Sequence, residues 1–478
     1  MDDPLPLIEM LPDEILLEIF DCHRLATLDD SSDLWKWHRL AHVCQRWRNL
    51  IFESPRRLDL QLVYTYKNPP RKSLELWPDL PVSVWYPNLK SPPRRRLTPE
   101  DEENVLAVLK HANRIRDINI SMTKQLATKS AASLKASFPI LQRLQLRSQE
   151  PIRPLPIPDG FLGGSTPLLR DIHLIRTIFP SLPVLLLSAR ALVSLQLDDI
   201  PNSGYFSPEA LANSLVGMAQ LNTLKIRFLP PNAHESNLDA SLTNRAILPA
   251  LTEFEFKGNC EYVEDLVSRI DAPALGQISI TFIERPTFGI PRLARFVGRT
   301  KEAKLPYQTS IRLSDEVMIT QHFRRPSCAG SGGSGAFQLQ IPCDELDRQV
   351  SLLIHICQYI SEPLSGVERF DIEAFPRVSH WMDGEEMDTS VWLELFRSFR
   401  GAKSLEVSGG LVTSVASALE RATGEMARII LPSLRDLHML DPLSSASASS
   451  TIEQFVAARQ HCNRPVAVHY EKEGSLED

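Results

Sequence analysis

The stretch Leu141-Gln142-Arg143-Leu144-Gln145-Leu146 has apolar residues at its first, fourth and sixth positions, and this pattern returns along the chain. Residues two apart in an extended strand lie on the same face, so the fourth and sixth positions face a core while the fifth faces outward. The pattern therefore predicts a set of strands that are built alike. Ten copies occur, and they begin at Ile115, Leu141, Leu169, Leu192, Leu221, Leu251, Leu275, Val367, Ala402 and Leu434.

The copies recur at nearly regular distances. The first seven begin 23 to 30 residues apart, a gap of 92 residues follows, and the last three begin 35 and 32 residues apart. The early distances lie within or just beyond the period of roughly 20–29 residues that leucine-rich repeats show, so the array resembles such repeats. One strand–helix unit cannot bury its apolar face alone, and successive units must therefore stack.

Helical patterns lie between many copies of the strand. The clearest begins at Ser207, a residue type that caps helices, with Pro208 at the first helical position and Glu209 behind it. Comparable helices are predicted at Glu261–Ile270, Ser390–Phe399, Leu411–Ala422 and Ile452–Cys462. The low-complexity run Ser444–Ser450 is expected to be a loop.

The segment Gly298–Glu362 departs from the repeat. It contains two predicted strands, Ser310–Leu313 and Phe337–Ile341, and one predicted helix, Asp344–Ile360. The asparagine that usually follows the strand of a leucine-rich repeat is also nearly absent, since only Asn259 occupies that place. The fold class expected from the array is therefore α/β, with an irregular and variably curved solenoid of strand–helix units.

A different pattern precedes the array. Pro12 stands at a plausible first helical position, and Asp13 and Glu14 follow in the first turn, where carboxylates favour the positive end of a helix. The apolar stripe of this first helix consists of Leu11, Ile15, Leu16, Ile19 and Phe20. A second helix is indicated by the set Leu40, Val43, Cys44, Trp47, Leu50 and Ile51. Two short helices cannot bury all of this apolar surface by themselves.

Residues 6–57 resemble an F-box on these positions, which follow one another in the order that the family has them. With the array, the chain is similar to F-box/leucine-rich-repeat proteins, especially the large set found in mushroom-forming fungi. This resemblance implies the substrate-recognition subunit of a Skp–cullin–F-box ubiquitin ligase. The head would bind a Skp-family adaptor, and through it a cullin–RING ligase, while the repeats would bind a target protein. The adaptor-binding residues that it implies are Leu11, Pro12, Ile15, Leu16, Ile19, Phe20, Leu40, Val43, Cys44, Trp47 and Leu50.

The chain is thus expected to have three regions. Residues 6–57 form the helical head, residues 58–112 a proline-rich connecting region with the first irregular repeats, and residues 113–470 the irregular leucine-rich-repeat array. Two alternatives remain open. The helix pair could serve only as a cap on the first repeats. The chain could also be a non-catalytic scaffold for protein–protein interaction that is not coupled to a ligase.

The outward positions on either side of each strand's fourth residue would line the concave face of such an array. Seven of these twenty residues are acidic and three are Lys or Arg, which predicts a mildly acidic face, more so toward its C-terminal half. A target segment with positive charge would complement that face. The alternative is that these residues are merely solvated. The candidate target-binding residues are Arg143, His173, Lys225, Glu253, Glu255, Asp371, Glu406 and His438.

Composition argues against several other classes of protein. The chain has 478 residues, which is longer than the length at which a single hydrophobic core stops growing, so several domains or a repeat array are expected. Its 43% hydrophobic and 23% charged content is typical of folded proteins. A net charge of −7 gives no basic footprint for nucleic acid. Met1–Asp3 lack the features of a signal peptide, and the apolar stretch Leu182–Leu197 is short and interrupted for a membrane span. Seven cysteines without a CxxC pair favour reduced thiols, so we expect the cytoplasm or the nucleus.

No motif predicts catalysis or a cofactor. His38 and His42 lie four residues apart near Cys22 and Cys44, but no further ligand pair completes a zinc site. The GxGxxG run Gly330–Gly335 follows no strand and precedes no helix, so a flexible loop is the better interpretation. We therefore expect a protein that binds other proteins, without enzymatic activity, metal or cofactor.

Overall fold

The structure is a computed structural model that describes residues 7–25, 37–54, 58, 60–66, 69–70, 73–76, 80–87, 96–150, 153–230, 245–286, 289–300, 306–323, 335–360, 364–374, 389–440 and 445–471. The chain divides into two units, Met1–Ala191 and Leu192–Asp478, and each is described by itself. The glycine-rich run at 330–334 lies outside the described residues. Within them, no helix combines the length and the apolar character that crossing a membrane requires.

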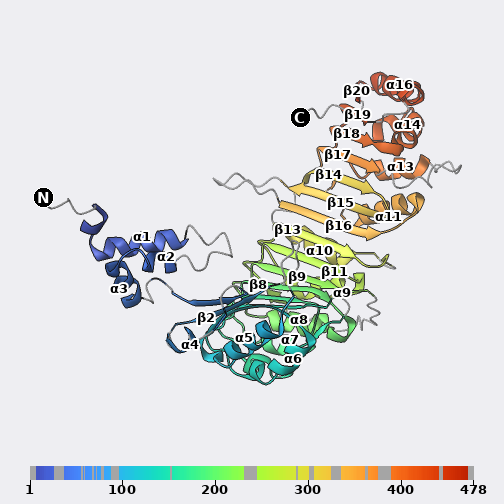
Figure 1. The fold of residues 1–478 in the computed structure, drawn as a ribbon. Coiled ribbons are helices and arrows are strands. Elements are labelled where there is room, and N and C mark those ends of the chain that lie inside the picture. The colour runs from blue at the N-terminus through green and yellow to red at the C-terminus, as the bar shows by residue number, and fades with distance from the viewer. Residues whose placement is uncertain are drawn as a thin grey trace. The chain divides into compact units, whose positions relative to one another are not determined.

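The N-terminal part of the first unit is a group of short helices (Figure 1). These are α1 (Asp13–Leu25), α2 (Trp37–Ala41) and α3 (Gln45–Glu53), and the 3-10 turn η1 (Leu7–Met10) precedes them. The second predicted helix is therefore two helices. The break falls at Cys44, whose extended backbone (φ −153°) cannot belong to a helix and whose Sγ accepts a hydrogen bond from the backbone N–H of Trp47 at 3.5 Å.

A parallel sheet makes up the rest of the first unit. Its strands, in spatial order, are β1 (Leu62–Thr65), β2 (Val82–Tyr86), β3 (Ile115–Met122), β4 (Arg143–Ser148) and β6 (Asp171–Ile175). The helices among the described residues are α4 (Ser73–Leu76), α5 (Pro99–Leu109), α6 (Lys124–Ser130) and α7 (Leu182–Leu186). A second small sheet pairs β5 (Leu155–Pro156) with β7 (Thr177–Ile178). Strands β1 and β2 lie in the region expected to hold the first irregular repeats, and neither was predicted individually.

The second unit continues the same construction. Its parallel strands are β8 (Ser194–Ile200), β9 (Thr223–Phe228), β11 (Glu253–Gly258), β13 (Gln277–Phe282), β17 (Arg369–Ala374), β18 (Ser404–Ser408), β19 (Asp436–Leu440) and β20 (Ala467–Glu471). A separate small sheet pairs β10 (Ala246–Ile247) with β12 (Ile270–Asp271). The helices among its described residues are α8 (Pro208–Leu215), α9 (Cys260–Arg269), α10 (Pro291–Arg299), α11 (Leu346–Tyr359), α13 (Thr389–Phe396), α14 (Val412–Glu420), α15 (Met426–Ile429) and α16 (Ser445–His461). Helices α13, α14 and α16 follow one another along one side of the strands (Figure 1).

All ten predicted strands form, and they pair in the register that the sequence pattern predicts. Phe254 lies opposite Leu224 on one side and opposite Ile278 on the other, so equivalent positions of successive copies meet. Leu405 is placed in the same way between Phe370 and Leu437. The fourth and sixth positions are buried and the fifth faces outward. The α/β class with a helical N-terminal head is confirmed.

The irregular segment extends the sheet instead of interrupting it. Strands β14 (Pro306–Leu313), β15 (Glu316–Phe323) and β16 (Gly335–Pro342) form an antiparallel meander between β13 and β17. The middle strand, β15, runs antiparallel to both of its neighbours. The outer strands therefore keep the direction of the array: β16 runs parallel to β13, and β14 runs parallel to β17. The two strands and the helix predicted here are confirmed with longer bounds for the strands, whereas β15 was missed.

One predicted loop is wrong. The run Ser444–Ser450 was expected to be a low-complexity loop, but α16 begins at Ser445 and continues to His461. Alternating serine and alanine does not prevent a helix, since alanine has the highest helix propensity and serine costs only a few tenths of a kcal/mol, about 0.5. The apolar side chains Ile452 and Phe455 then anchor the helix in the core.

Candidate functional site

The head is held together by aromatic and aliphatic side chains at its centre. The rings of Phe20 (α1) and Trp47 (α3) meet edge-on, with their centroids 4.8 Å apart and their planes at 60°. Leu16 and Ile51 are completely buried around them. Edge-to-face aromatic pairs contribute about 0.5–1.5 kcal/mol beyond the burial of their area. These four side chains therefore fix α1 against α3.

Hydrogen bonds and an ion pair of Arg46 join the starts of the same two helices. The guanidinium of Arg46 donates to Asp13 Oδ1 at 2.6 Å and to the carbonyl oxygen of Leu11 at 2.6 Å. Arg48 Nε donates to the carbonyl oxygen of Ala41 at 3.0 Å and so ties α3 to the end of α2. The acidic first turn of α1 thus has two favourable partners, the helix N-terminus and Arg46.

Several large apolar side chains of the head remain exposed. Ile15 and Ile19 are 47% and 40% exposed, and their spacing of four residues places them side by side on α1. Val43, in the turn before α3, is 59% exposed. Ile8 and Met10 in η1 are exposed as well. Exposed apolar residues grouped on so small a unit are typical of a protein-binding surface.

The eleven predicted adaptor-binding residues therefore fall into three sets by exposure. Leu16, Phe20, Trp47 and Leu50 are buried and hold the head, while Pro12, Ile15, Ile19 and Val43 are exposed; Leu11, Leu40 and Cys44 are partly buried. The predicted stripe of α1 was too broad for one helix face, because its members point both inward and outward. Leu17, which is buried, and the exposed Ile8 and Met10 were missed.

The outward face of the second unit's strands carries cross-strand ion pairs. Lys225 Nζ (β9) lies 2.6 Å from Glu253 Oε1 and 3.9 Å from Glu255 Oε2, both on β11. Arg227 pairs with Glu255 and, at 3.4 Å, with Asp198 Oδ1. Three of the predicted target-binding residues thus belong to a single network.

A second network lies farther along the same unit. Arg369 (β17) contacts Asp371 Oδ1 at 3.2 Å and Glu406 Oε2 (β18) at 2.9 Å. In the adjoining strands, Glu406 lies opposite His438, and the ring of His438 stacks on that of His469 with centroids 4.6 Å apart. The predicted residues Asp371, Glu406 and His438 are therefore brought into one row by the strand register.

In the first unit, Arg143 and His173 also point outward from neighbouring strands. Arg143 forms two hydrogen bonds to the Asp117 carboxylate, at 2.7 and 3.0 Å, and Ser83 Oγ donates to the same carboxylate at 2.6 Å. Asp117 is only 2% exposed, so Arg143 has a structural partner of its own. Burial raises the pKa of the nearby Asp171 carboxyl above its ordinary value, against the lowering effect of Arg143.

These pairs change how the predicted acidic face is understood. The acidic residues are present, but arginines on the same face pair with several of them, as Arg227 does with Glu255 and Arg369 with Asp371 and Glu406. Alternating charges held in pairs offer hydrogen-bond donors and acceptors rather than one uniform negative field. The sequence could not show this, because the pairs form between residues about 30 positions apart.

The cysteine, histidine and acidic side chains of the described residues are the groups that a metal site would require. Among these described residues, no three His, Cys, Asp or Glu side chains gather in a group that could hold a metal ion. Cys22 and Cys44 are free thiols, as are the buried Cys260, Cys343 and Cys357. Burial raises the pKa of Cys357 to about 12, which keeps this thiol protonated and unreactive near neutral pH.

Comparison with known proteins identifies the head. Residues 8–60 match the F-box-like family, and this segment contains all three helices and the exposed apolar residues described above. An F-box-like domain implies a Skp-type adaptor as partner, within a cullin ligase, and F-box proteins are generally non-catalytic adaptors. No curated protein matches the chain.

Proposed function

We propose that this chain is the substrate-recognition subunit of a Skp–cullin–F-box ubiquitin ligase. The observation that carries the proposal is the F-box-like match at residues 8–60, on a head whose apolar side chains are partly left exposed. In this proposal the head binds the adaptor, and the strand–helix array, which we take to be of the leucine-rich-repeat type, holds a target protein. The chain brings the two together, in the cytoplasm or the nucleus, and performs no chemistry.

The adaptor surface is proposed to centre on Ile15, Ile19 and Val43, with Pro12 beside them. Burial of exposed aliphatic side chains of this size against a partner removes apolar surface from water, which favours binding. The buried residues Leu16, Phe20, Trp47 and Leu50 act indirectly, because they hold α1 and α3 in the arrangement that presents this surface.

The target surface is proposed to be the outward face of the strands. Its polar residues are Arg143, His173, Lys225, Glu253, Glu255, Asp371, Glu406 and His438, and most of them are restrained by the cross-strand contacts described above. Restrained side chains lose less conformational entropy on binding than free ones. For the regions of the chain we propose the head at 6–57, a connecting region with the first repeats at 58–112, and the main array at 113–470.

The competing function is a repeat scaffold that binds proteins without delivering them to a ligase. The two functions are separated by comparing the full chain with a chain that lacks residues 1–57. A receptor predicts that only the full chain retains the Skp-family adaptor and the cullin, and that proteins bound to the array live longer in cells that carry the shortened chain. Unchanged lifetimes of those proteins, with the adaptor still bound by the full chain, would favour the scaffold.

A further inference from the structure

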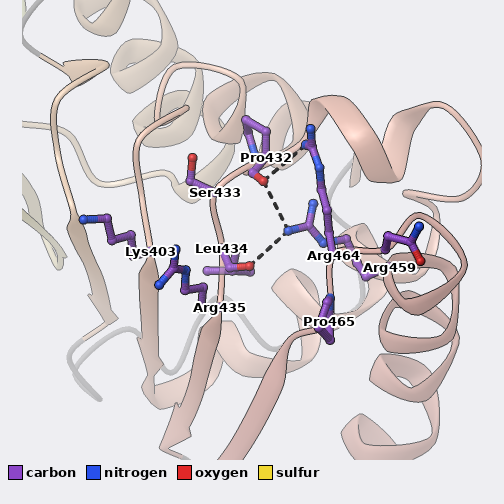
Figure 2. Close-up of a pocket in the computed structure, with 9 residues that line it drawn as sticks. Lys403, Pro432, Ser433, Leu434, Arg435, Arg459, Arg464 and Pro465 are labelled. Atoms are coloured by element: carbon purple, nitrogen blue, oxygen red, sulfur yellow. Dashed lines mark hydrogen bonds between the residues drawn. The ribbon is translucent and has the colours of Figure 1, made fainter.

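A pocket of about 530 Å³ opens at the C-terminal end of the second unit. Figure 2 shows it between α16 and the segments that lead into β18, β19 and β20. Its volume lies in the range of roughly 300–1,000 Å³ that is usual for small-ligand sites. The lining residues are Lys403, Pro432, Ser433, Leu434, Arg435, Arg459, Asn463, Arg464 and Pro465.

The pocket gathers positive charge. Lys403, Arg435, Arg459 and Arg464 are four cations, and none of the lining residues is acidic. Lys403 and Arg435 stand on adjoining segments, since the backbone N–H of Arg435 donates to the carbonyl oxygen of Lys403 at 2.8 Å. Like charges on neighbouring segments repel each other unless an anion lies between them.

Two of these cations, Arg435 and Lys403, form few contacts with other side chains of the described residues. Arg435 is exposed, and its guanidinium makes no hydrogen bond or ion pair with any described residue. Lys403 Nζ reaches Glu368 Oε1 at 2.9 Å, but both side chains are more than 40% exposed, and such surface pairs contribute little. Ser433, also exposed, adds a hydroxyl without a recorded partner in the described residues.

Arg459 also lines the pocket and is fully buried. Its guanidinium donates to the carbonyl oxygens of Ala427 at 2.9 Å and Leu434 at 3.0 Å, and its Nε has no hydrogen-bond acceptor among the described residues. Burial, and then the charge of Arg464, lower the pKa of Arg459 from its usual value. A buried cation whose partners are all neutral is costly, and an incoming anion would lower that cost.

A purely structural account explains only part of the cluster. Arg464 Nη1 donates to the carbonyl oxygens of Arg428 at 3.1 Å and Pro432 at 3.2 Å, so Arg459 and Arg464 together hold the loop between α15 and β19 (Figure 2). That role does not explain why the buried Nε of Arg459 lacks a hydrogen-bond acceptor among the described residues. It equally leaves Arg435 and Lys403 unexplained, since both line the same pocket without serving the loop.

We propose that this pocket binds a phosphate group. Guanidinium groups present paired N–H donors that match the oxygens of a phosphate, and a lysine ammonium and a serine hydroxyl complement them. The phosphate is carried either by a phosphorylated side chain of the target protein or by a small free ligand. Only the first source rests on the proposed function; the phosphate site itself does not.

The test is calorimetric titration of the full chain with inorganic pyrophosphate, with a phosphoserine peptide, and with the same peptide unphosphorylated. The changed chain carries Lys403→Ser and Arg435→Ser, which spare the two arginines that hold the loop. Its control is Arg190→Ser, because Arg190 is an exposed arginine before β8 with no recorded contact in the described residues. Arg435→Lys keeps the charge but removes the paired donors.

The site predicts that pyrophosphate or the phosphopeptide binds, that the double variant weakens the binding about tenfold or more, and that Arg190→Ser leaves it within about twofold. Tighter binding of the phosphopeptide than of pyrophosphate identifies a phosphorylated target; the reverse identifies a free ligand. Equal affinity of the double variant and the unchanged chain would overturn the proposal, as would no binding of either probe. Adaptor capture by the double variant stays intact in every case, so failure of this site is distinguishable from failure of the proposed function.

Discussion

Trp47 of α3 lies edge-on against Phe20 of α1, 4.8 Å between ring centroids, and this contact helps to hold the two helices of the head together. Both rings are buried, so neither can contribute directly to a partner's binding site in this arrangement. The F-box resemblance alone places all of these residues on one binding surface. In the structure some are buried in the head, such as Phe20 and Trp47, and others are exposed, such as Ile15 and Ile19. Changes to each set should have different consequences.

Truncation of the aromatic pair should unfold the head. Trp47→Ala or Phe20→Ala removes a buried aromatic side chain and is expected to cost about 3–5 kcal/mol, which exceeds what so small a unit can lose. Hydrogen exchange of the amides in α1 and α3 measures this directly: both helices should lose protection, while the strands β8–β13 keep theirs. Retained protection in α1 would mean that the ring contact is dispensable.

Arg143 should behave as a structural residue as well as a surface residue. Arg143→Ala leaves the buried Asp117 carboxylate with Ser83 as its remaining recorded side-chain donor, and we expect a loss of about 1–3 kcal/mol in the free energy of unfolding. Urea unfolding checks this value. The matched change is Arg153→Ala, because Arg153 is 72% exposed and only distantly paired, and it should alter stability by less than about 0.5 kcal/mol. Equal stability of the two variants would remove the structural role of Arg143.

Buried Cys357 gives a pH-dependent prediction. Burial raises its pKa from 9.0 to about 12, so the folded chain holds the thiol protonated while the unfolded chain ionises it near the ordinary value. Its contribution to stability is therefore complete below pH 9 and is lost as the pH rises toward 12. At pH 8 a thiol-reactive dye should label the exposed Cys22 at once and Cys357 only after unfolding. Simultaneous labelling of both would contradict the burial.

The paired charges of the sheet face should govern which target is held. Changing Glu253, Glu255 and Glu406 to Lys together leaves Lys225, Arg227 and Arg369 among like charges and should abolish capture of targets that present positive charge. Cross-linking in cells, followed by identification of the captured proteins, measures the loss.

The matched control for this change reverses three exposed glutamates on helices, Glu209, Glu394 and Glu453, which alters the net charge equally. Capture of the same proteins by both triple variants would show that the sheet face takes no part in recognition.

Much of the array was predictable because its signal is local. A strand with buried fourth and sixth positions needs only its own six residues to be recognised, and equal construction of the copies then fixes the register, as between Phe254 and Ile278. Strand β15 has the same alternation, with Val317 and Ile319 buried, but it runs antiparallel to its neighbours and lacks the leading apolar residue of the pattern.

What escaped prediction depends on contacts between distant residues. The periodicity of α1 could not tell Leu16, which is completely buried, from its neighbour Ile15, which is exposed, until α3 was placed against it. The pairing of Lys225 with Glu253 and the assembly of the cationic pocket from Lys403, Arg435 and Arg459 likewise require the strands to be in position.

The central claim, that the exposed apolar side chains of the head bind a Skp-family adaptor, is tested most directly by Ile15→Asp combined with Ile19→Asp. Both residues are exposed, so the head should stay folded, with its free energy of unfolding changed by less than about 1 kcal/mol. The control is Ile247→Asp, because Ile247 is 63% exposed in the other unit. Adaptor affinity, measured with the purified adaptor and the full chain, should fall at least about tenfold for the double variant and remain unchanged for the control. Undiminished adaptor binding by the folded double variant would contradict the account.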